Sequence, residues 1–211
     1  MNLQAGVRIV RNCCALMLAL AVTLAACGDK TPKLPKLAAT DVVVAFGDSL
    51  TYGTGADEAE SYPVVLGQLI GRTVVRAGAP GEVTAQGLAR LPAVIDEHKP
   101  RLVIVCLGGN DMLRQVPDAE IAQNLRSIVR MLQEKKIGVV LVGVPKPALI
   151  TSAPVFYADL AKELGIPYEG KVVTSVLYSN ETKSDPIHPN AKGYRRMAEA
   201  IAQLLKNAGA I

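Results

Sequence analysis

Short apolar runs of strand length alternate along the chain with longer stretches in which apolar residues recur every three or four positions. The short runs predict buried strands, and the periodic stretches predict amphipathic helices. The expected strands are 42–46, 73–77, 102–107 and 138–144, and the expected helices between them are 62–71, 83–97 and 118–135. Strands that alternate with helices predict an α/β fold, a three-layer α/β/α sandwich with a central, mostly parallel sheet.

The last part of the chain is less regular. Its apolar positions predict two short helices, 153–164 and 170–178, and a final amphipathic helix over 190–207. Pro92 lies inside the second of the longer helix patterns. Because proline lacks the backbone N–H that a helix uses, it predicts a kink or a late start there.

Residues 1–26 have the layout of a secretory signal peptide, with Arg8 and Arg11 followed by an apolar run too short to span a membrane comfortably. The residues 24–27, Leu-Ala-Ala-Cys, resemble the lipobox of bacterial lipoproteins, which implies cleavage before Cys27 and lipid on that residue. The alternative is a signal peptide that is cut elsewhere, with Cys27 incidental.

In lipoproteins of this kind the residue after the cysteine biases sorting, and Gly28 at that position implies the outer membrane. We therefore expect a bacterial membrane-anchored lipoprotein that faces the periplasm. Residues 27–40 carry spaced prolines and lysines without apolar periodicity, so they are expected to be a lipidated tether. The folded domain would then span 41–211.

Composition narrows the functions further. Half of the 211 residues are apolar, which suits one well-packed domain. The formal net charge of +4 falls to +2 when the two leader arginines are removed, and no dense basic run remains, so nucleic acid is excluded as a partner. Of the four cysteines only Cys106 would remain unmodified in the domain, in an apolar run, where a small buried hydrophobe is expected.

The first apolar run ends at the sequence Gly47-Asp48-Ser49-Leu50. A serine just past a buried strand lies where open α/β sheets bind ligands, outside the carboxyl ends of the strands. An isolated Asp-Ser pair at such a place is more often an ordinary turn. Ser49 becomes a candidate nucleophile only if the chain also supplies a base within reach.

The chain has two histidines, and they differ in context. His98 stands in a charged helix end before a strand, which places it at the wrong edge of the sheet. His188 stands between two prolines, with Asp185 three residues before it. The Asp185 carboxylate can accept from one ring nitrogen and leave the other free to take the proton of Ser49. Taken alone, the Asp-x-x-His spacing is also typical of the first residues of a helix that have no catalytic role.

Four blocks together resemble the signature of the SGNH, or GDSL, hydrolase superfamily, in the usual order. They are residues 47–50, 81–84, 108–111 and 185–190, within a match that spans 41–205. Within that superfamily the chain is most similar to the small bacterial arylesterase, acyl-CoA thioesterase and lysophospholipase group. It departs from residues common there at Arg76, Pro80 and Cys106.

The resemblance implies a Ser-His-Asp triad of Ser49 as nucleophile, His188 as general base and then acid, and Asp185 as the group that orients it. It also implies an oxyanion hole made of the backbone N–H groups of Ser49 and Gly81 and the side-chain amide of Asn110. Asp48 and Asp111 are expected to hold loops through bonds to backbone. Neither a metal nor another cofactor is expected, because two distant histidines and one buried cysteine make no plausible zinc site.

Loops 50–60, 112–116 and 145–156 are expected to face the substrate. Their apolar residues suit an acyl chain, although several could simply cover helices. These residues are Met112, Leu113, Val116, Leu149, Ile150, Val155 and Phe156. The absence of Trp argues against a sugar-stacking platform.

The leading hypothesis is a lipid-tethered, monomeric ester hydrolase that forms an acyl-enzyme with lysophospholipids or similar single-chain acyl esters. An acetylesterase acting on cell-wall or exported polysaccharide is a second possibility. A lipoprotein that keeps the fold only as a binding module is a third.

Overall fold

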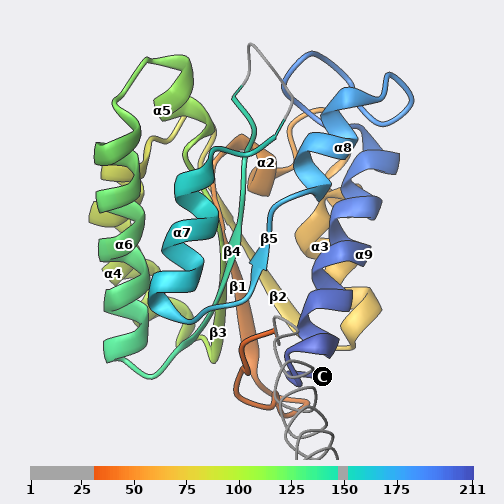
Figure 1. The fold of residues 1–211 in the computed structure, drawn as a ribbon. Coiled ribbons are helices and arrows are strands. Elements are labelled where there is room, and N and C mark those ends of the chain that lie inside the picture. Colours follow the sequence, from red (N-terminus) through yellow and green to blue (C-terminus); the bar gives the residue numbers. More distant parts are fainter. Residues whose placement is uncertain (1–30, 147–151) are drawn as a thin grey trace, which may run out of the picture. The chain divides into compact units, whose positions relative to one another are not determined.

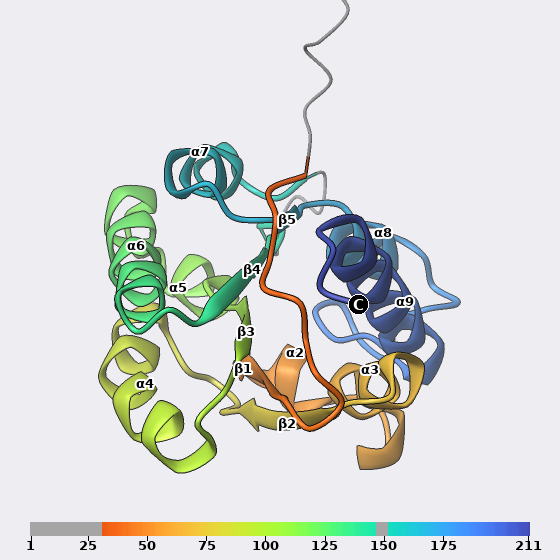
Figure 2. The ribbon, with the colours of Figure 1, turned by 90° about the horizontal axis from the view of Figure 1, so that it is seen from below.

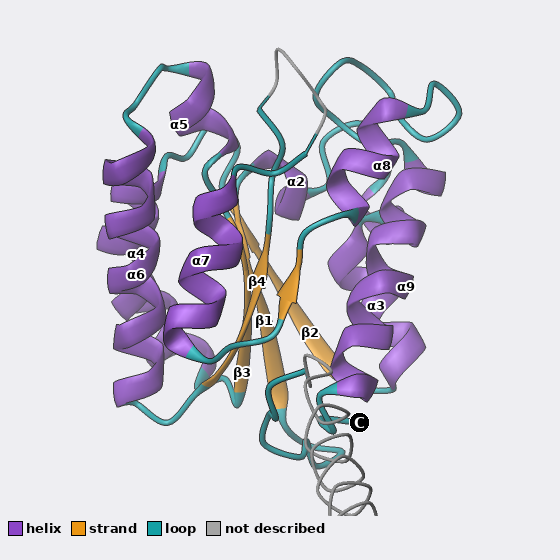
Figure 3. Ribbon diagram, in the orientation of Figure 1, coloured by secondary structure: helices purple, strands orange, loops and turns teal. Residues whose placement is uncertain are grey.

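A parallel sheet with helices on both faces forms the centre of the computed structural model, which describes residues 31–146 and 152–211 (Figures 1 and 3). The predicted signal peptide and Cys27 therefore lie outside the described residues. The strands of the described part are β1 (Val42–Gly47), β2 (Thr73–Gly78), β3 (Leu102–Cys106), β4 (Gly138–Val142) and β5 (Tyr168–Glu169). The predicted three-layer α/β fold is confirmed, with every described strand pairing parallel.

The strand order is β2-β1-β3-β4-β5. The order reverses between β1 and β3, because the chain passes outward from β1 to β2 and then crosses back to β3. At such a switch point the connections leave in opposite directions, so open α/β sheets bind ligands there, outside the carboxyl ends. The register sets Gly47 beside both Gly78 and Cys106, so the segments after β1, β2 and β3 begin close together.

Helices form a layer on each face of the sheet (Figure 2). One layer contains α4 (Thr84–His98), α6 (Asp118–Glu134) and α7 (Val155–Leu164), and the other contains α3 (Tyr62–Ile70), α8 (Val172–Tyr178) and α9 (Ala191–Asn207). Because helices cover both faces, the central strands are apolar throughout, and every residue of β3 is fully buried. The apolar stripe predicted for α9 is buried as well, at Tyr194, Met197, Ala198, Ile201 and Leu205.

Several elements differ from the prediction. The short helices α2 (Ser49–Tyr52), η2 (Glu58–Glu60) and α5 (Gly109–Leu113) lie where only loops were expected, and the two-residue strand β5 was not expected. All four are too short to carry an apolar period. The late start considered for the second of the longer helices is wrong, because α4 begins at Thr84 and continues through Pro92.

The compact domain also begins before Asp41, because residues 32–40, which were expected to be part of the tether, belong to it. The Leu34 N–H donates to the Ala208 carbonyl at 3.0 Å, and the Leu37 N–H donates to the Ala210 carbonyl at 2.8 Å. The Leu37 side chain is only 3% exposed and belongs to the core. These contacts fasten the start of the described chain to the end of α9, near the amino ends of the strands (Figure 1).

Replacing Leu37 by Ala in a soluble protein that starts at Gly28 is expected to lower the free energy of unfolding by about 2–5 kcal/mol, because a buried leucine leaves a cavity. Leu69→Ala is the matched control, since Leu69 is 45% exposed, and it should change that free energy by less than about 1 kcal/mol. Urea titrations of both variants measure the difference. Equal effects would mean that residues before Asp41 add nothing to the domain.

Candidate active site

The turn after β1 holds Ser49 at the first position of α2. Asp48 caps this helix, and its Oδ1 accepts the Leu50 N–H at 3.0 Å. Only glycine fits at position 47, because a Cβ there would lie 2.2 Å from the Cys106 carbonyl oxygen. The Ser49 N–H has no acceptor among the described residues. As the first N–H of a helix it is available to an anion.

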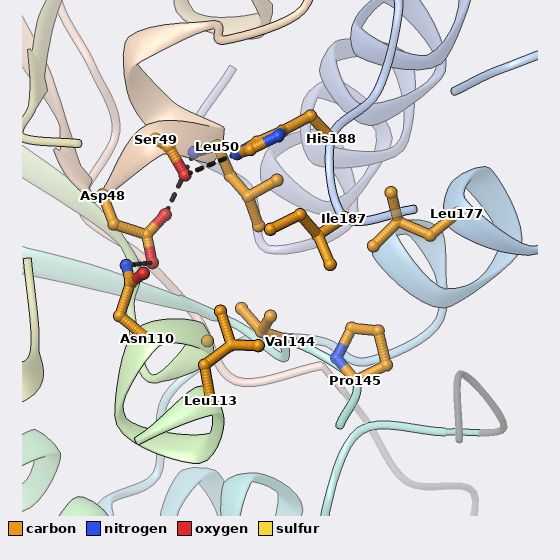
Figure 4. Close-up of a pocket in the computed structure, with 11 residues that line it drawn as sticks. Asp48, Ser49, Leu50, Asn110, Leu113, Val144, Pro145, Leu177, Ile187 and His188 are labelled. Carbon is orange, nitrogen blue, oxygen red and sulfur yellow. Dashed lines mark hydrogen bonds between the residues drawn. The ribbon is translucent and has the colours of Figure 1, made fainter. Parts of the chain in front are cut away.

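Ser49, His188 and Asp185 lie in a hydrogen-bonded row, although 139 positions separate Ser49 from His188. Figure 4 shows the Ser49 and His188 side chains of this row. The Ser49 Oγ is 3.0 Å from His188 Nε2, and His188 Nδ1 is 2.7 Å from Asp185 Oδ2. The other carboxylate oxygen, Asp185 Oδ1, accepts the N–H groups of Ile187 and His188 at 2.8 and 2.9 Å. One carboxylate thus holds both the turn and the imidazole ring.

The charge of Asp185 follows from these contacts. Burial raises the pKa of the Asp185 carboxyl, but the hydrogen bond from the His188 ring and those from the two backbone N–H groups outweigh it, so the pKa lies below its ordinary value. Asp185 is therefore an anion at neutral pH. An anion at Nδ1 keeps the proton there, which leaves Nε2 free to accept the hydroxyl proton of Ser49.

The third block brings Asn110 to the same place. Asn110 Nδ2 donates to the Glu82 carbonyl at 3.0 Å and to Asp48 Oδ2 at 3.3 Å, so its amide is held between the first and second blocks. Gly81 has φ +79, in the left-handed region that glycine adopts without strain. The Gly81 N–H has no acceptor among the described residues, and Arg114 Nη2 donates to the Gly81 carbonyl at 3.0 Å.

The two aspartates expected to hold loops do accept backbone N–H groups. Asp111 is 1% exposed and accepts the Thr84 N–H at the start of α4, at 2.9 Å to Oδ2. Asp48 is 2% exposed, and burial raises its pKa to about 7; the Leu50 N–H opposes that shift, and the nearby charges of Glu82 and Asp111 add to it. Part of the Asp48 population is therefore protonated near neutral pH.

Arg76, one of the departures from the family pattern, fastens the segment after Ser49. Its guanidinium donates to the Tyr52 carbonyl, lies 4.6 Å from the centre of the Tyr52 ring and pairs with Glu58 at 2.9 Å. Cys106 is fully buried, as predicted. His98 is the last residue of α4 and lies far from the carboxyl ends of the strands, which agrees with its exclusion as the base.

A hollow of about 370 Å³, counting its open mouth, lies beside Ser49 and His188 (Figure 4). Its lining is Asp48, Ser49, Leu50, Gly109, Asn110, Leu113, Val144, Pro145, Leu177, Ile187 and His188. Gly81 is not part of this lining.

The apolar lining differs from the prediction. Two of the seven residues expected, Leu149 and Ile150, lie outside the described residues. Of the five that the structure describes, only Leu113 faces the hollow. Met112, Val116 and Phe156 pack against the core, and Val155 is 73% exposed. The hollow is also lined by Val144, Leu177 and Ile187, which were not predicted from the sequence. Of these three, only Ile187 could have been predicted, because it directly precedes His188.

Within residues 31–146 and 152–211, no three His, Cys, Asp or Glu side chains lie close enough together to hold a metal ion. No helix in the same ranges combines the length and the apolar character needed to cross a membrane.

Known proteins resemble this chain in sequence and in fold. A model of the GDSL-like lipase/acylhydrolase family matches residues 45–196. The thioesterase 1/protease 1/lysophospholipase L1 of Escherichia coli strain K12 is 31% identical over 179 residues, covering 81% of this chain and 86% of that protein. Esterase TesA of Pseudomonas aeruginosa is 31% identical over 186 residues, covering 82% of this chain and 92% of that protein. The crystal structure of AlinE4, an SGNH-hydrolase family esterase, superimposes with a TM-score of 0.62 and 32% identity, covering 82% of this chain and 98% of that one.

Asp48 should make stability depend on pH. The folded protein holds the Asp48 proton up to about pH 7, whereas the unfolded chain releases it near the ordinary value of 3.8. Its contribution to the free energy of unfolding therefore falls as the pH rises from about 4 to 7. Urea unfolding at several pH values should show the stability of the wild type declining relative to Asp48→Asn across this window. A difference between the two proteins that stays constant with pH would contradict the burial of an ionisable Asp48.

Proposed function

The chain belongs to the GDSL-like lipase/acylhydrolase family, and from this premise we propose that it is a serine ester hydrolase that forms an acyl-enzyme on Ser49. The observation that carries the proposal is the row of Ser49, His188 and Asp185, with contacts of 3.0 and 2.7 Å. A serine hydroxyl is a weak nucleophile unless a base removes its proton as it attacks. Here the base and the group that orients it are both in place.

Each step of the reaction has a group to perform it. The Ser49 Oγ attacks the ester carbonyl carbon while its proton passes to His188 Nε2. The resulting imidazolium lies against the Asp185 anion, which stabilises it. His188 then gives the proton to the departing alcohol or thiol, and the acyl group stays on Ser49. A water molecule, deprotonated by the same nitrogen, then attacks the carbonyl carbon of the acyl-enzyme. The bond to Ser49 Oγ breaks, His188 returns the proton to that oxygen, and the acid is released.

Three donors would stabilise the oxyanion that forms on the carbonyl oxygen. They are the N–H groups of Ser49 and Gly81, which have no acceptor in the described part of the chain, and the Asn110 amide. Asn110 already gives its two N–H groups to Glu82 and Asp48, so it would exchange the longer bond, 3.3 Å to Asp48, for the substrate oxygen. Preorganised donors of this kind each contribute about a hundredfold or more to turnover.

The substrate we propose is a single-chain acyl ester, of which a lysophospholipid is one example. The apolar residues around the hollow support this proposal, since an acyl chain is what they can bind. They are Leu50, Leu113, Val144, Pro145, Leu177 and Ile187. The names of the relatives include esterase, thioesterase and lysophospholipase, so thioesters belong to the proposed range as well.

We also propose that lipid on Cys27 anchors a monomeric protein to the bacterial outer membrane, facing the periplasm. The lipobox-like residues 24–27 support the anchor.

A series of p-nitrophenyl esters from acetyl to palmitoyl tests the reaction in soluble protein from Gly28 onward. We expect turnover that peaks at medium or long chains and falls about a thousandfold or more in Ser49→Ala. A peak at acetyl would instead favour an acetylesterase. Background rates at every chain length, equal in both proteins, would contradict the proposed reaction and leave a binding module.

Replacement of Cys27 tests the anchor. In a bacterium that expresses the full chain, the wild type should partition with membranes and incorporate labelled palmitate, because acylation of the cysteine supplies the hydrophobic anchor. Cys27→Ala should lose the label and leave the outer-membrane fraction. Cys13→Ala is the matched control and should behave as the wild type. Equal labelling of both variants would overturn the assignment of Cys27.

A further inference from the structure

An ion pair between a partly buried guanidinium and a buried carboxylate lies next to the backbone that carries the proposed oxyanion donors. Arg90 Nε is 2.7 Å from Glu82 Oε1, and Arg90 Nη2 is 2.7 Å from Glu82 Oε2, so the guanidinium grips the carboxylate with two bonds. Glu82 is 7% exposed although it belongs to a loop. A carboxylate withdrawn from water in this way needs its cation, because an unpaired buried charge is strongly unfavourable.

The same guanidinium also binds the ends of two strands. Arg90 Nη2 donates to the Ala77 carbonyl at 3.2 Å and to the Gly47 carbonyl at 3.4 Å. Its charged carbon lies 4.3 Å from the centre of the Phe46 ring. Arg90 therefore connects the Glu82 loop to β2 and to the last residues of β1. Only Asp48 separates Gly47, the last residue of β1, from Ser49.

Glu82 in turn holds the donors that the reaction would use. Its backbone carbonyl accepts from Asn110 Nδ2 at 3.0 Å, and its backbone N–H bonds to the Ala79 carbonyl at 3.1 Å, which closes a tight turn around Gly81. A displacement of the Glu82 backbone would therefore move both the Gly81 N–H and the Asn110 amide. Oxyanion donors act only within about 2.7–3.1 Å of the oxyanion, so a small displacement matters.

We propose that Arg90, acting through Glu82, is a positioning residue that sets the Gly81 N–H and the Asn110 amide at the distance from Ser49 that the oxyanion requires. This role rests on the proposed ester hydrolysis. It predicts a loss of transition-state stabilisation rather than of substrate binding, because the ion pair does not line the hollow.

The test compares Arg90→Met with Arg126→Met, measuring kcat and KM on the p-nitrophenyl ester that the wild type prefers. Arg126 is the matched control, because it makes a similar bidentate ion pair with Glu163. The two shortest hydrogen bonds between them are 2.8 Å long, and the pair joins α6 to α7, away from the hollow. We expect kcat to fall about tenfold to a hundredfold in Arg90→Met, with KM changed less than about threefold. Arg126→Met should keep both constants within about twofold.

Two further variants separate positioning from general destabilisation. Arg90→Lys keeps the charge but lacks the planar fork, so its kcat should lie between those of the wild type and Arg90→Met. In an Asn110→Ala background, Arg90→Met should reduce kcat by a clearly smaller factor than in the wild type, because one of the donors it positions is already gone. An equal factor in both backgrounds would overturn the positioning role. If Arg90→Met does not fold, the same comparisons are made with Arg90→Lys and Glu82→Gln.

Ser49→Ala, measured in parallel, separates this proposal from the one on which it rests. A wild type no faster than Ser49→Ala contradicts both. Activity that depends on Ser49 but is unchanged in folded Arg90→Met contradicts the positioning role alone.

Discussion

The close approach of backbone at the carboxyl end of β1 is the constraint on which the site depends. Gly47 lies between Gly78 of β2 and Cys106 of β3, and a Cβ on Gly47 or on Gly78 would lie 2.2 Å from a neighbouring backbone atom. Only glycine permits this spacing. It brings the three segments that follow these strands together, and the proposed nucleophile and all three proposed oxyanion donors lie on those segments.

Three buried carboxylates stabilise the segments once they have converged, and each has its own partner. Asp48 accepts the Leu50 N–H, Asp111 accepts the Thr84 N–H, and Glu82 binds Arg90. Apolar residues would cost less to bury, but they could not orient backbone N–H groups. The pKa of Asp48 is raised to about 7 mainly by its burial, and the nearby charges of Glu82 and Asp111 add to the shift. Asp185 differs from these three carboxylates, because it stays accessible to solvent and its pKa lies below the ordinary value.

The sequence predicts those strands and helices that are long enough to show an apolar run or an apolar period. β1 to β4 and the longer helices are apolar runs or periodic stretches, and their observed bounds lie within about two residues of the prediction. The row of Ser49, His188 and Asp185 could be anticipated because the chain offers few candidate bases and four of its sequence blocks resemble the SGNH signature. Arg90 could not, since a single arginine on a helix normally lies in water and only the packing of α4 on the strand ends reveals its contacts. Leu37 was missed because the spaced prolines and lysines before it show no apolar period.

Reaction with a fluorophosphonate, followed by the intact mass of the protein, tests the central claim most directly. The claim is that His188 activates Ser49 as a nucleophile. The serine oxygen would form a bond to phosphorus as fluoride leaves, with the proton passing to His188. The account predicts a single adduct on the peptide that contains Ser49, none in Ser49→Ala, and a greatly slowed reaction in His188→Ala. An unmodified wild type, an adduct on another residue, or equal rates in the wild type and His188→Ala would contradict it.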